Sequence, residues 1–170
     1  PAHSSALRGR VVANMFFEPS TRTRLSFDLA ASRLGAHVLT FDPDTASSLK
    51  GESLRDTALT VQAIGADILV VRHPESGAPQ AVHEWTGIAV VNAGDGSNEH
   101  PTQSLLDALT LRQRFGTLNG LRIGVIGDIG HSRVARSLQH VMGTLGAEVV
   151  YIGPEGLLPE EQPYGITCST

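Results

Sequence analysis

Five segments with the apolar spacing of an α-helix each end at a glycine, and this punctuation restricts the fold more than any other feature of the chain. A glycine after a helix favours the left-handed backbone conformation in which many helices terminate. The five glycines are Gly35, Gly65, Gly87, Gly116 and Gly146. The helices that precede them are expected over residues 23–34, 53–64, 78–85, 102–115 and 132–145.

Short apolar runs rich in β-branched residues alternate with these helices. The runs lie at residues 11–17, 37–41, 66–71, 88–92, 121–126 and 148–152. Strands that alternate with helices in this way form a parallel sheet with helices on both faces. The sequence therefore predicts an α/β fold with six strands.

The predicted elements divide into two α/β domains. A turn at residues 115–120, between a long helix and a new strand, is the best candidate for a boundary. We expect a first domain over residues 1–101, a linking helix over 102–115, and the start of a second, Rossmann-like domain over 116–170. The chain opens on a proline and stops just after a strand-like run, which is typical of a fragment.

The composition argues against several classes of function. The net charge is −4, and acidic and basic residues are mixed along the chain, so no nucleic-acid partner is expected. No apolar run approaches the ~20 residues of a membrane-spanning helix, and no signal peptide is visible at the start. A single cysteine, Cys168, cannot form an intramolecular disulfide, so we expect a cytoplasmic location.

The run Ser20-Thr21-Arg22-Thr23-Arg24, between the first strand and the first helix, is the strongest candidate for a ligand site. Backbone N–H groups at a helix N-terminus have no partner within the helix, and a guanidinium fits phosphate oxygens. Basic residues there oppose the helix dipole unless an anion offsets them. The run therefore predicts an anion site. The alternative is that Ser20 or Thr21 caps the helix while both arginines point into water.

Other strand ends supply further candidates, because ligands of open parallel sheets bind beyond the carboxyl ends of the strands. A loop with glycines after the fourth strand delivers His100 and Gln103 to the start of a helix. Arg72 directly follows the third strand. The alternatives are a structural role for His100, an ion pair between Arg72 and Glu75, and a hydrogen bond from His73 to a neighbouring loop.

Residues 124–130 follow a strand and lead into a helix, but their glycines do not have the spacing of a dinucleotide-binding fingerprint. Asp128 and Arg133 are candidates for substrate contacts there, with an ion pair between them as the alternative. The histidines are dispersed, so no metal site is expected. No cofactor and no glycine-flanked nucleophile are expected either.

Together, these segments resemble the carbamoyltransferase family, in which a Ser-Thr-Arg-Thr-Arg loop binds phosphate and a His-Pro-x-Gln segment serves the carbamoyl group. The matching segments occur in the family's order between about Leu7 and Gly153. Residues 17–24, 50–52 and 92–96 are more similar to the aspartate-specific members than to the ornithine-specific ones.

The resemblance implies transfer of the carbamoyl group from carbamoyl phosphate to the amine of L-aspartate, giving N-carbamoyl-L-aspartate and phosphate in pyrimidine biosynthesis. The side chains implied to hold the phosphate are those of Ser20, Thr21, Arg22, Thr23 and Arg72. Thr23, Arg72 and His100 would polarise the carbamoyl oxygen, and Gln103 would accept a hydrogen bond from the carbamoyl nitrogen. Fixed donors at that oxygen stabilise the charge that develops in the transition state.

The resemblance also implies that Arg133 and Lys50 bind aspartate. The loop with Ser47, Ser48 and Lys50 would reach a neighbouring subunit's site, so we expect a homotrimer with active sites at subunit interfaces. Regulatory chains or other enzymes of the pathway stay open as partners. Only Leu49 separates Ser48 from Lys50, where family members place two residues, and this departure weakens the role of Ser48.

The family's aspartate domain contributes an Arg-x-Gln loop and a Pro-Leu loop, and neither occurs in this chain. We therefore expect the chain alone to turn over weakly or not at all. Three alternatives stay open: a carbamoyltransferase with ornithine or another amine as acceptor, a non-catalytic scaffold domain of the same fold, and a generic nucleotide-binding Rossmann domain.

Overall fold

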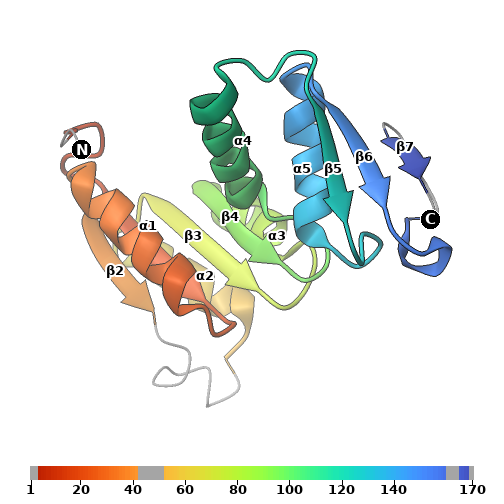
Figure 1. Ribbon diagram of the computed structural model, residues 1–170. Coiled ribbons are helices and arrows are strands. Elements are labelled where there is room, and N and C mark those ends of the chain that lie inside the picture. The colour runs from red at the N-terminus through yellow and green to blue at the C-terminus, as the bar shows by residue number, and fades with distance from the viewer. Residues whose placement is uncertain (1–3, 42–51, 160–164, 169–170) are drawn as a thin grey trace. The chain divides into compact units, whose positions relative to one another are not determined.

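The computed structural model describes residues 4–41, 52–159 and 165–168 (Figure 1). The chain forms two compact units, Pro1–Asp95 and Gly96–Thr170. Each unit contains a sheet of parallel strands with helices packed on it. The predicted α/β class is confirmed, as is the parallel sheet flanked by helices. The domain boundaries expected at residues 101 and 116 stay a prediction.

The first unit is built on a four-stranded sheet. Its strands are β1 (Val11–Phe16), β2 (His37–Phe41), β3 (Ile68–His73) and β4 (Ala89–Asp95). They lie in the order β2-β1-β3-β4, and every neighbouring pair is parallel. Since β1 and β3 occupy the centre, both of their faces are covered, and their sequences are accordingly almost continuously apolar.

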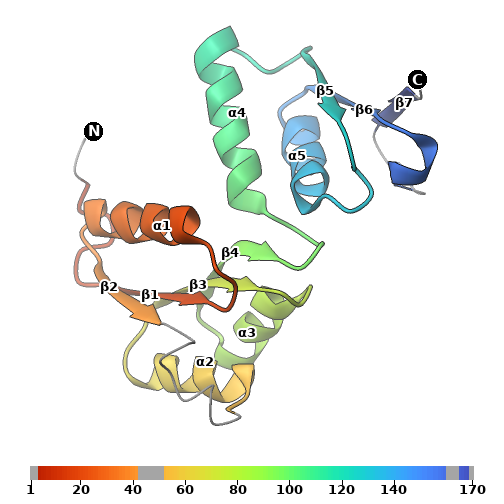
Figure 2. The same cartoon turned by 60° about the horizontal axis from the view of Figure 1, so that its bottom comes forward.

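Three helices cover this sheet: α1 (Thr21–Arg33), α2 (Leu54–Ala63) and α3 (Ala78–Thr86). Figure 2 shows α1 on one face of the sheet and α2 with α3 on the other. Successive residues of β1 and β3 therefore point into different apolar clusters. Met15 and Val71 belong to the cluster with Val61 of α2 and Val82 of α3.

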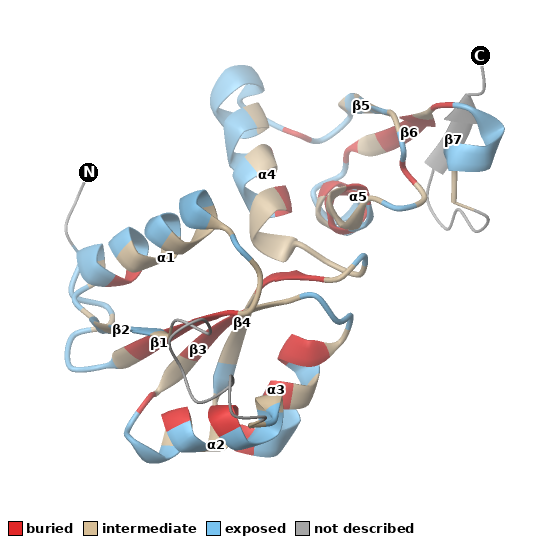
Figure 3. Ribbon diagram, turned by 90° about the horizontal axis from the view of Figure 1, so that it is seen from below, coloured by how far each residue is buried: buried red, intermediate tan, exposed pale blue. Residues whose placement is uncertain are grey.

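The opposite cluster packs under α1. It contains Val12, Phe16 and Val70 from the strands and Ala31 from the helix. The central strands β1 and β3 are the best-buried part of this unit (Figure 3), whereas the outer faces of its helices are exposed. The unit is thus a sheet between two helical layers.

The second unit contains α4 (Pro101–Phe115), β5 (Arg122–Ile126), α5 (Arg133–Thr144), β6 (Glu148–Ile152), a 3-10 turn (Glu155–Leu157) and β7 (Gly165–Cys168). Its strands are parallel in the order β5-β6-β7, and α4 packs against α5. Met142 and Tyr151 lie in its core with Leu118 and Leu138.

The predicted count of six strands is wrong, because β7 adds a seventh at Gly165–Cys168. This strand is only four residues long, which is too short for apolar alternation to separate it from an irregular segment. It is recognised through its backbone pairing with β6.

The predicted glycine punctuation is confirmed. All five glycines have positive φ, between 71° at Gly87 and 108° at Gly65. The helices also lie where they were expected, apart from shifts of one or two residues at their ends. The shift that bears on function is at α1, which begins at Thr21 rather than at residue 23, so the predicted anion-binding run forms its first turn.

Asp67 ties the amino ends of β1 and β3 together, at the edge of the sheet opposite to the candidate ligand site. Its carboxylate accepts a hydrogen bond from the backbone N–H of Val11 at 2.8 Å and another from the guanidinium of Arg10 at 2.9 Å. These two bonds hold the pKa of Asp67 below its ordinary value of 3.8. A carboxyl group whose pKa is lowered by folding stabilises the native state above the unfolded pKa, and this contribution is lost as the pH falls through the folded pKa.

We therefore expect Asp67→Asn to lower the Tm at neutral pH. The difference in Tm from the wild-type protein should shrink as the pH falls from 3.8 through the lowered pKa of the folded carboxyl, because the wild-type carboxyl then becomes protonated as well. Thermal melts followed by circular dichroism across this pH range measure the difference. A gap that stays constant down to strongly acidic pH would contradict this account of Asp67.

Candidate functional site

The sheet of the first unit changes its winding direction between β1 and β3. The chain adds β2 on one side of β1 and later adds β3 and β4 on the other side. In open α/β sheets, the crevice beyond the carboxyl ends of the strands at such a point is the usual place for a ligand. The two strands end together there, since Phe16 pairs with Arg72 and the N–H of Phe17 donates to the carbonyl of Arg72 at 2.9 Å.

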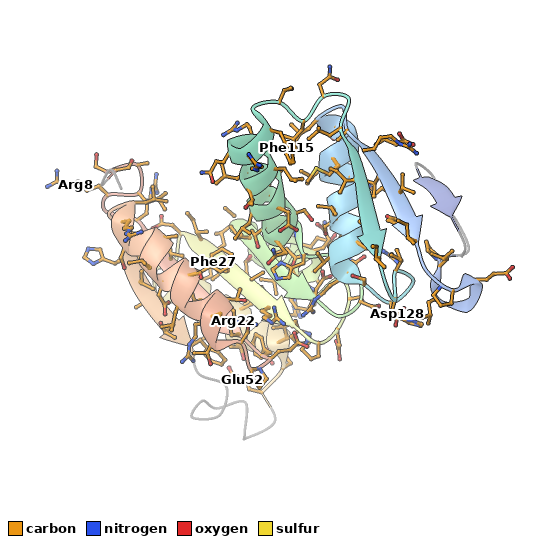
Figure 4. The ribbon with its side chains drawn as sticks, in the orientation of Figure 1. Arg8, Arg22, Phe27, Glu52, Phe115 and Asp128 are labelled. Carbon is orange, nitrogen blue, oxygen red and sulfur yellow. The ribbon has the colours of Figure 1, made fainter. Side chains whose placement is uncertain are left out.

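The helix α1 begins at this edge with hydroxyl and guanidinium groups and no acidic residue in its first turn. The first backbone N–H bonded within the helix is that of Arg24, which donates to the carbonyl of Ser20 at 3.0 Å. The N–H groups of the preceding turn therefore lack partners in the helix. Arg22 is exposed at the start of α1 (Figure 4), and its side chain bonds to no other residue of the described part of the chain.

Ser20 differs from the other serines that precede helices. Ser53 accepts a hydrogen bond from the N–H of Asp56 at 3.1 Å, and Ser132 accepts one from the N–H of Ala135 at 3.2 Å. Both are ordinary side-chain caps. Within the described residues Ser20 makes no such bond, so the alternative that its hydroxyl caps α1 is wrong.

We expect Ser20→Ala to change the free energy of unfolding by less than about 0.5 kcal/mol, because no cap is lost. The matched substitution Ser53→Ala should lower it by about 1 kcal/mol, because a cap is lost. Urea denaturation measures both. Titration calorimetry with inorganic phosphate should show weaker binding for Ser20→Ala only. Equal destabilisation by the two substitutions would show instead that Ser20 acts as a cap.

Arg72 is the second cation at this edge, with 12% of its side chain exposed. Its Nε lies 3.1 Å from a carboxylate oxygen of Glu18, and one terminal nitrogen donates to the carbonyl of Ala93 at 3.3 Å. Arg72 thus forms an ion pair with Glu18, whereas the sequence had suggested Glu75 as its partner. A phosphate that shares Arg72 meets the negative charge of Glu18, so the two anions compete for one guanidinium.

His73, next to Arg72, has a structural role. Its Nδ1 accepts a hydrogen bond from the N–H of Glu75 at 3.0 Å, and its ring packs edge-on against Phe17 with centroids 5.2 Å apart. Burial lowers the pKa of His73 below its ordinary value of 6.5, which favours the neutral ring that can accept this bond. This bond lies within the segment that follows β3, whereas the sequence had suggested a bond to a neighbouring loop.

Two candidates for carbamoyl binding lie at the start of α4 in the second unit. His100 is the N-cap residue, and its backbone N–H donates to Oγ of Ser137 at 2.8 Å. Gln103, in the first turn, donates from Nε2 to Asp107 at 2.9 Å. Since a side-chain amide accepts only through its carbonyl oxygen, Oε1 is the atom of Gln103 that can accept a bond from a ligand.

Arg133, the candidate for binding the amine substrate, is the first residue of α5. Its guanidinium donates to the carbonyl of Gly96 at 2.9 Å. Asp128, which the sequence had offered as its ion-pair partner, instead bonds to Nδ1 of His131 at 2.9 Å. This hydrogen bond lowers the pKa of Asp128 below its ordinary value of 3.8. Figure 4 labels Asp128 in the loop after β5.

Sequence reasoning did not single out three acidic residues near these candidates. Glu18 pairs with Arg72, as described above. Asp95 is 1% exposed and accepts a hydrogen bond from the N–H of Gly77. Glu99 accepts a hydrogen bond from the hydroxyl of Ser137. All three lie at or just after the carboxyl end of a strand, and this shared position is the signal that could have found them.

The remaining candidates, Ser47, Ser48 and Lys50, lie outside the described residues. Among the residues that the structure describes, no group of three His, Cys, Asp or Glu side chains could hold a metal ion. Within the same ranges, no helix has the length and apolar character to cross a membrane.

The edge of the first unit is suited to a phosphate-like anion. The first turn of α1 offers backbone N–H groups, two threonine hydroxyls and the Arg22 guanidinium, and α1 directs the positive end of its dipole the same way. Arg72 adds a second guanidinium at the end of β3. A doubly charged phosphate group would offset this positive charge and satisfy several of the donors at once.

Comparison with known proteins also points to a ligand that contains phosphate. A family model described as the carbamoyl-phosphate-binding domain of aspartate/ornithine carbamoyltransferase matches residues 1–113. The aspartate carbamoyltransferase catalytic subunit of Salinispora arenicola is 60% identical over 154 residues, which cover 91% of this chain and 50% of that protein. The subunit of Mycobacterium leprae is 57% identical over 172 residues, with 95% and 54% covered. The chain thus spans about half the length of these curated relatives.

Solved structures of aspartate transcarbamoylase from Trypanosoma cruzi are also similar to this chain. The complex with aspartate and phosphate superposes with a TM-score of 0.88 at 33% identity, covering 98% of this chain and 58% of that one. The complex with N-(phosphonacetyl)-L-aspartic acid gives 0.83 at 37% identity, with 91% and 50% covered.

Proposed function

This chain belongs to the aspartate/ornithine carbamoyltransferase family through its carbamoyl-phosphate-binding domain, and from that premise we propose that the protein is an aspartate carbamoyltransferase. It transfers the carbamoyl group of carbamoyl phosphate to the amine of L-aspartate. The products are N-carbamoyl-L-aspartate and phosphate, and the reaction serves pyrimidine synthesis. The acceptor is aspartate because the relatives that are more than half identical to this chain carry that name.

The observation that carries the proposal is the first turn of α1, which has no side-chain cap. This turn follows β1, and the last residue of β1 pairs with Arg72. Ser20, Thr21, Arg22 and Thr23 bind the phosphate group of carbamoyl phosphate through hydroxyls, backbone N–H groups and the guanidinium. Arg72 shares this anion. The cationic groups at a helix N-terminus, which are unfavourable in the empty site, become favourable when the phosphate is bound.

The carbamoyl group is activated by polarisation of its oxygen. Thr23, Arg72 and His100 donate to that oxygen, and Gln103 accepts a hydrogen bond from the carbamoyl nitrogen through Oε1. The amine nitrogen of aspartate attacks the carbamoyl carbon, and negative charge develops on the oxygen. Donors that are already fixed at this position stabilise the transition state more than the ground state.

The reaction is complete without a covalent enzyme intermediate. A bond forms between the amine nitrogen and the carbamoyl carbon, and the bond between that carbon and the phosphate oxygen breaks with its electron pair leaving on phosphate. The amine nitrogen loses a proton, which the departing phosphate can accept. Holding both substrates in one site supplies much of the remaining rate, since the encounter becomes intramolecular.

The acceptor side of the site involves Arg133 and Lys50, which bind the carboxylates of aspartate. The loop with Ser48 and Lys50 belongs to a neighbouring subunit's site, so the working assembly is a cytoplasmic homotrimer. Since the chain spans about half the length of its relatives, the 170 residues alone turn over weakly or not at all.

Turnover of two acceptors tests this function. The full-length protein that carries this sequence is incubated with carbamoyl phosphate and either L-aspartate or L-ornithine, and the carbamoylated product is measured. We expect carbamoyl aspartate to form and ornithine to be a poor acceptor. Turnover of ornithine alone would assign the ornithine-type alternative, and no turnover with either acceptor would assign a non-catalytic scaffold.

A binding measurement tests the phosphate site separately from the acceptor site. The 170-residue chain should bind inorganic phosphate and carbamoyl phosphate in titration calorimetry, because the phosphate-binding turn lies in its first unit. The same chain should show little turnover of aspartate. Robust carbamoylation of aspartate by this chain would contradict the assignment of further acceptor residues outside it.

A further inference from the structure

β4 carries one extra residue opposite Arg72. Val71 pairs with Asn92 and His73 pairs with Asp95, so the single residue between the pairs in β3 faces two residues in β4. Such an insertion is a β-bulge, which bends the strand and re-aims the side chains around it. The β3 residue opposite the bulge is Arg72, which the proposed function places on the phosphate.

Two side chains close this bulge. Asn92 accepts a hydrogen bond from the N–H of Gly94 at 2.8 Å and donates from Nδ2 to Oδ1 of Asp95 at 2.8 Å. Oδ2 of Asp95 accepts from the N–H of Gly77, the N-cap residue of α3, at 2.6 Å. Gly94 has a φ of 114°, a conformation that favours glycine. The bulge is therefore held in one geometry by a continuous row of hydrogen bonds.

The side chain of Arg72 contacts the bulge through a backbone carbonyl. One of the two bulged residues is Ala93, which is 0% exposed, and its carbonyl accepts a hydrogen bond from the Arg72 guanidinium at 3.3 Å. The direction of that carbonyl depends on how the bulge is closed. Asp95 is itself 1% exposed, and a carboxylate is retained at such depth only when its oxygens are hydrogen-bonded.

We propose that Asp95 is a positioning residue for Arg72: together with Asn92 it closes the β4 bulge, and the Ala93 carbonyl then directs the guanidinium to the phosphate. This inference rests on the proposed function, because it takes Arg72 as a ligand of the phosphate. If Asp95 only anchors the N-terminus of α3, its replacement lowers stability and leaves the affinity for phosphate unchanged.

A swap of the two side chains tests the proposal. In Asp95→Asn, an amide N–H₂ replaces an oxygen that faces an N–H donor, so one bond of the row is lost. In the double variant Asn92→Asp with Asp95→Asn, the middle donor and acceptor are exchanged, and all three bonds can form again. We expect Asp95→Asn to raise the Kd for inorganic phosphate and the KM for carbamoyl phosphate about tenfold, and the swap to restore both to within about twofold.

A second comparison isolates the path through Arg72. In an Arg72→Gln background, adding Asp95→Asn should change the Kd for phosphate by less than about twofold, because the residue that it positions is gone. The full-length protein is used throughout, with calorimetry for the Kd and a thermal melt for stability. An equal effect of Asp95→Asn with and without Arg72 would overturn the proposal.

Two other results would also overturn it. One is an Asp95→Asn protein that melts earlier yet binds phosphate with the wild-type Kd. The other is a swap that restores the Tm and leaves the Kd raised. Failure of the proposed function is a separate result, seen as the absence of phosphate binding by the wild-type protein, and it would overturn both proposals.

Discussion

Arg22→Gln is expected to lower kcat/KM for carbamoyl phosphate by about a thousandfold. In the proposed site the Arg22 guanidinium binds the phosphate, and glutamine offers neither the charge nor the two parallel N–H donors. The fold should not suffer, since the side chain is exposed and bonds to no other described residue. Removing a positive charge from the N-terminus of α1 should even raise the free energy of unfolding by a few tenths of a kcal/mol, roughly.

The matched control is Arg33→Gln, at the other end of the same helix. Arg33 is exposed and lies in the last turn of α1, where a positive charge favours the helix. Its replacement should leave kcat/KM unchanged and lower stability slightly, opposite in sign to Arg22→Gln. Steady-state kinetics and urea denaturation measure both. A similar loss of kcat/KM in the two variants would mean that overall charge, rather than a contact of Arg22, attracts the phosphate.

His100→Ala is expected to lower kcat by roughly a hundredfold, as removal of one donor to a developing oxyanion does in other enzymes. The KM for carbamoyl phosphate should change less, because the proposed phosphate contacts come from α1 and Arg72. The helix start should survive, since it is the backbone N–H of His100, and not its ring, that donates to Ser137. Initial rates at saturating substrates give the change in kcat.

His83→Ala serves as the control for the loss of an imidazole. His83 is exposed on α3, where Nδ1 bonds to the carbonyl of Ile88 at 2.8 Å. Its replacement should leave kcat within about twofold of the wild-type value, as expected for a surface position away from the site. If His100→Ala keeps more than about a tenth of the wild-type kcat, the effect is too small for a principal donor to the carbamoyl oxygen. That result would contradict the proposed catalytic role of His100.

The fold could be predicted from the sequence because its signals are local. A glycine that follows a segment of helical periodicity, such as Gly87 or Gly146, marks the C-terminal end of a helix regardless of its tertiary surroundings. Strand ends were less well predicted. β3 and β4 were expected to stop at Val71 and Asn92, but they continue to His73 and Asp95. The added residues are polar or small, and backbone pairing in a sheet does not require the large apolar side chains by which strands were recognised.

The candidate site was predictable only in outline. The rule that ligands bind beyond strand ends selected Arg22, Arg72 and His100 as candidates. It could not supply their partners. The pairing of Arg72 with Glu18 depends on β1 and β3 lying side by side, and the hydrogen bond of Asp95 to Gly77 depends on the packing of α3 beside β4. Such contacts are set by tertiary structure and leave no local pattern in the sequence.

The six residues of β3 contribute both to the packing of the core and to the proposed ligand site. Leu69, Val70 and Val71 are exposed by 0 to 3% and fill the cores on both faces of the sheet. The next residue, Arg72, carries proposed chemistry. Close-packed interiors transmit even the loss of a methylene group to their neighbours. A smaller residue at Val71 would therefore loosen the packing next to Arg72, and we expect it to weaken both the fold and the binding of phosphate.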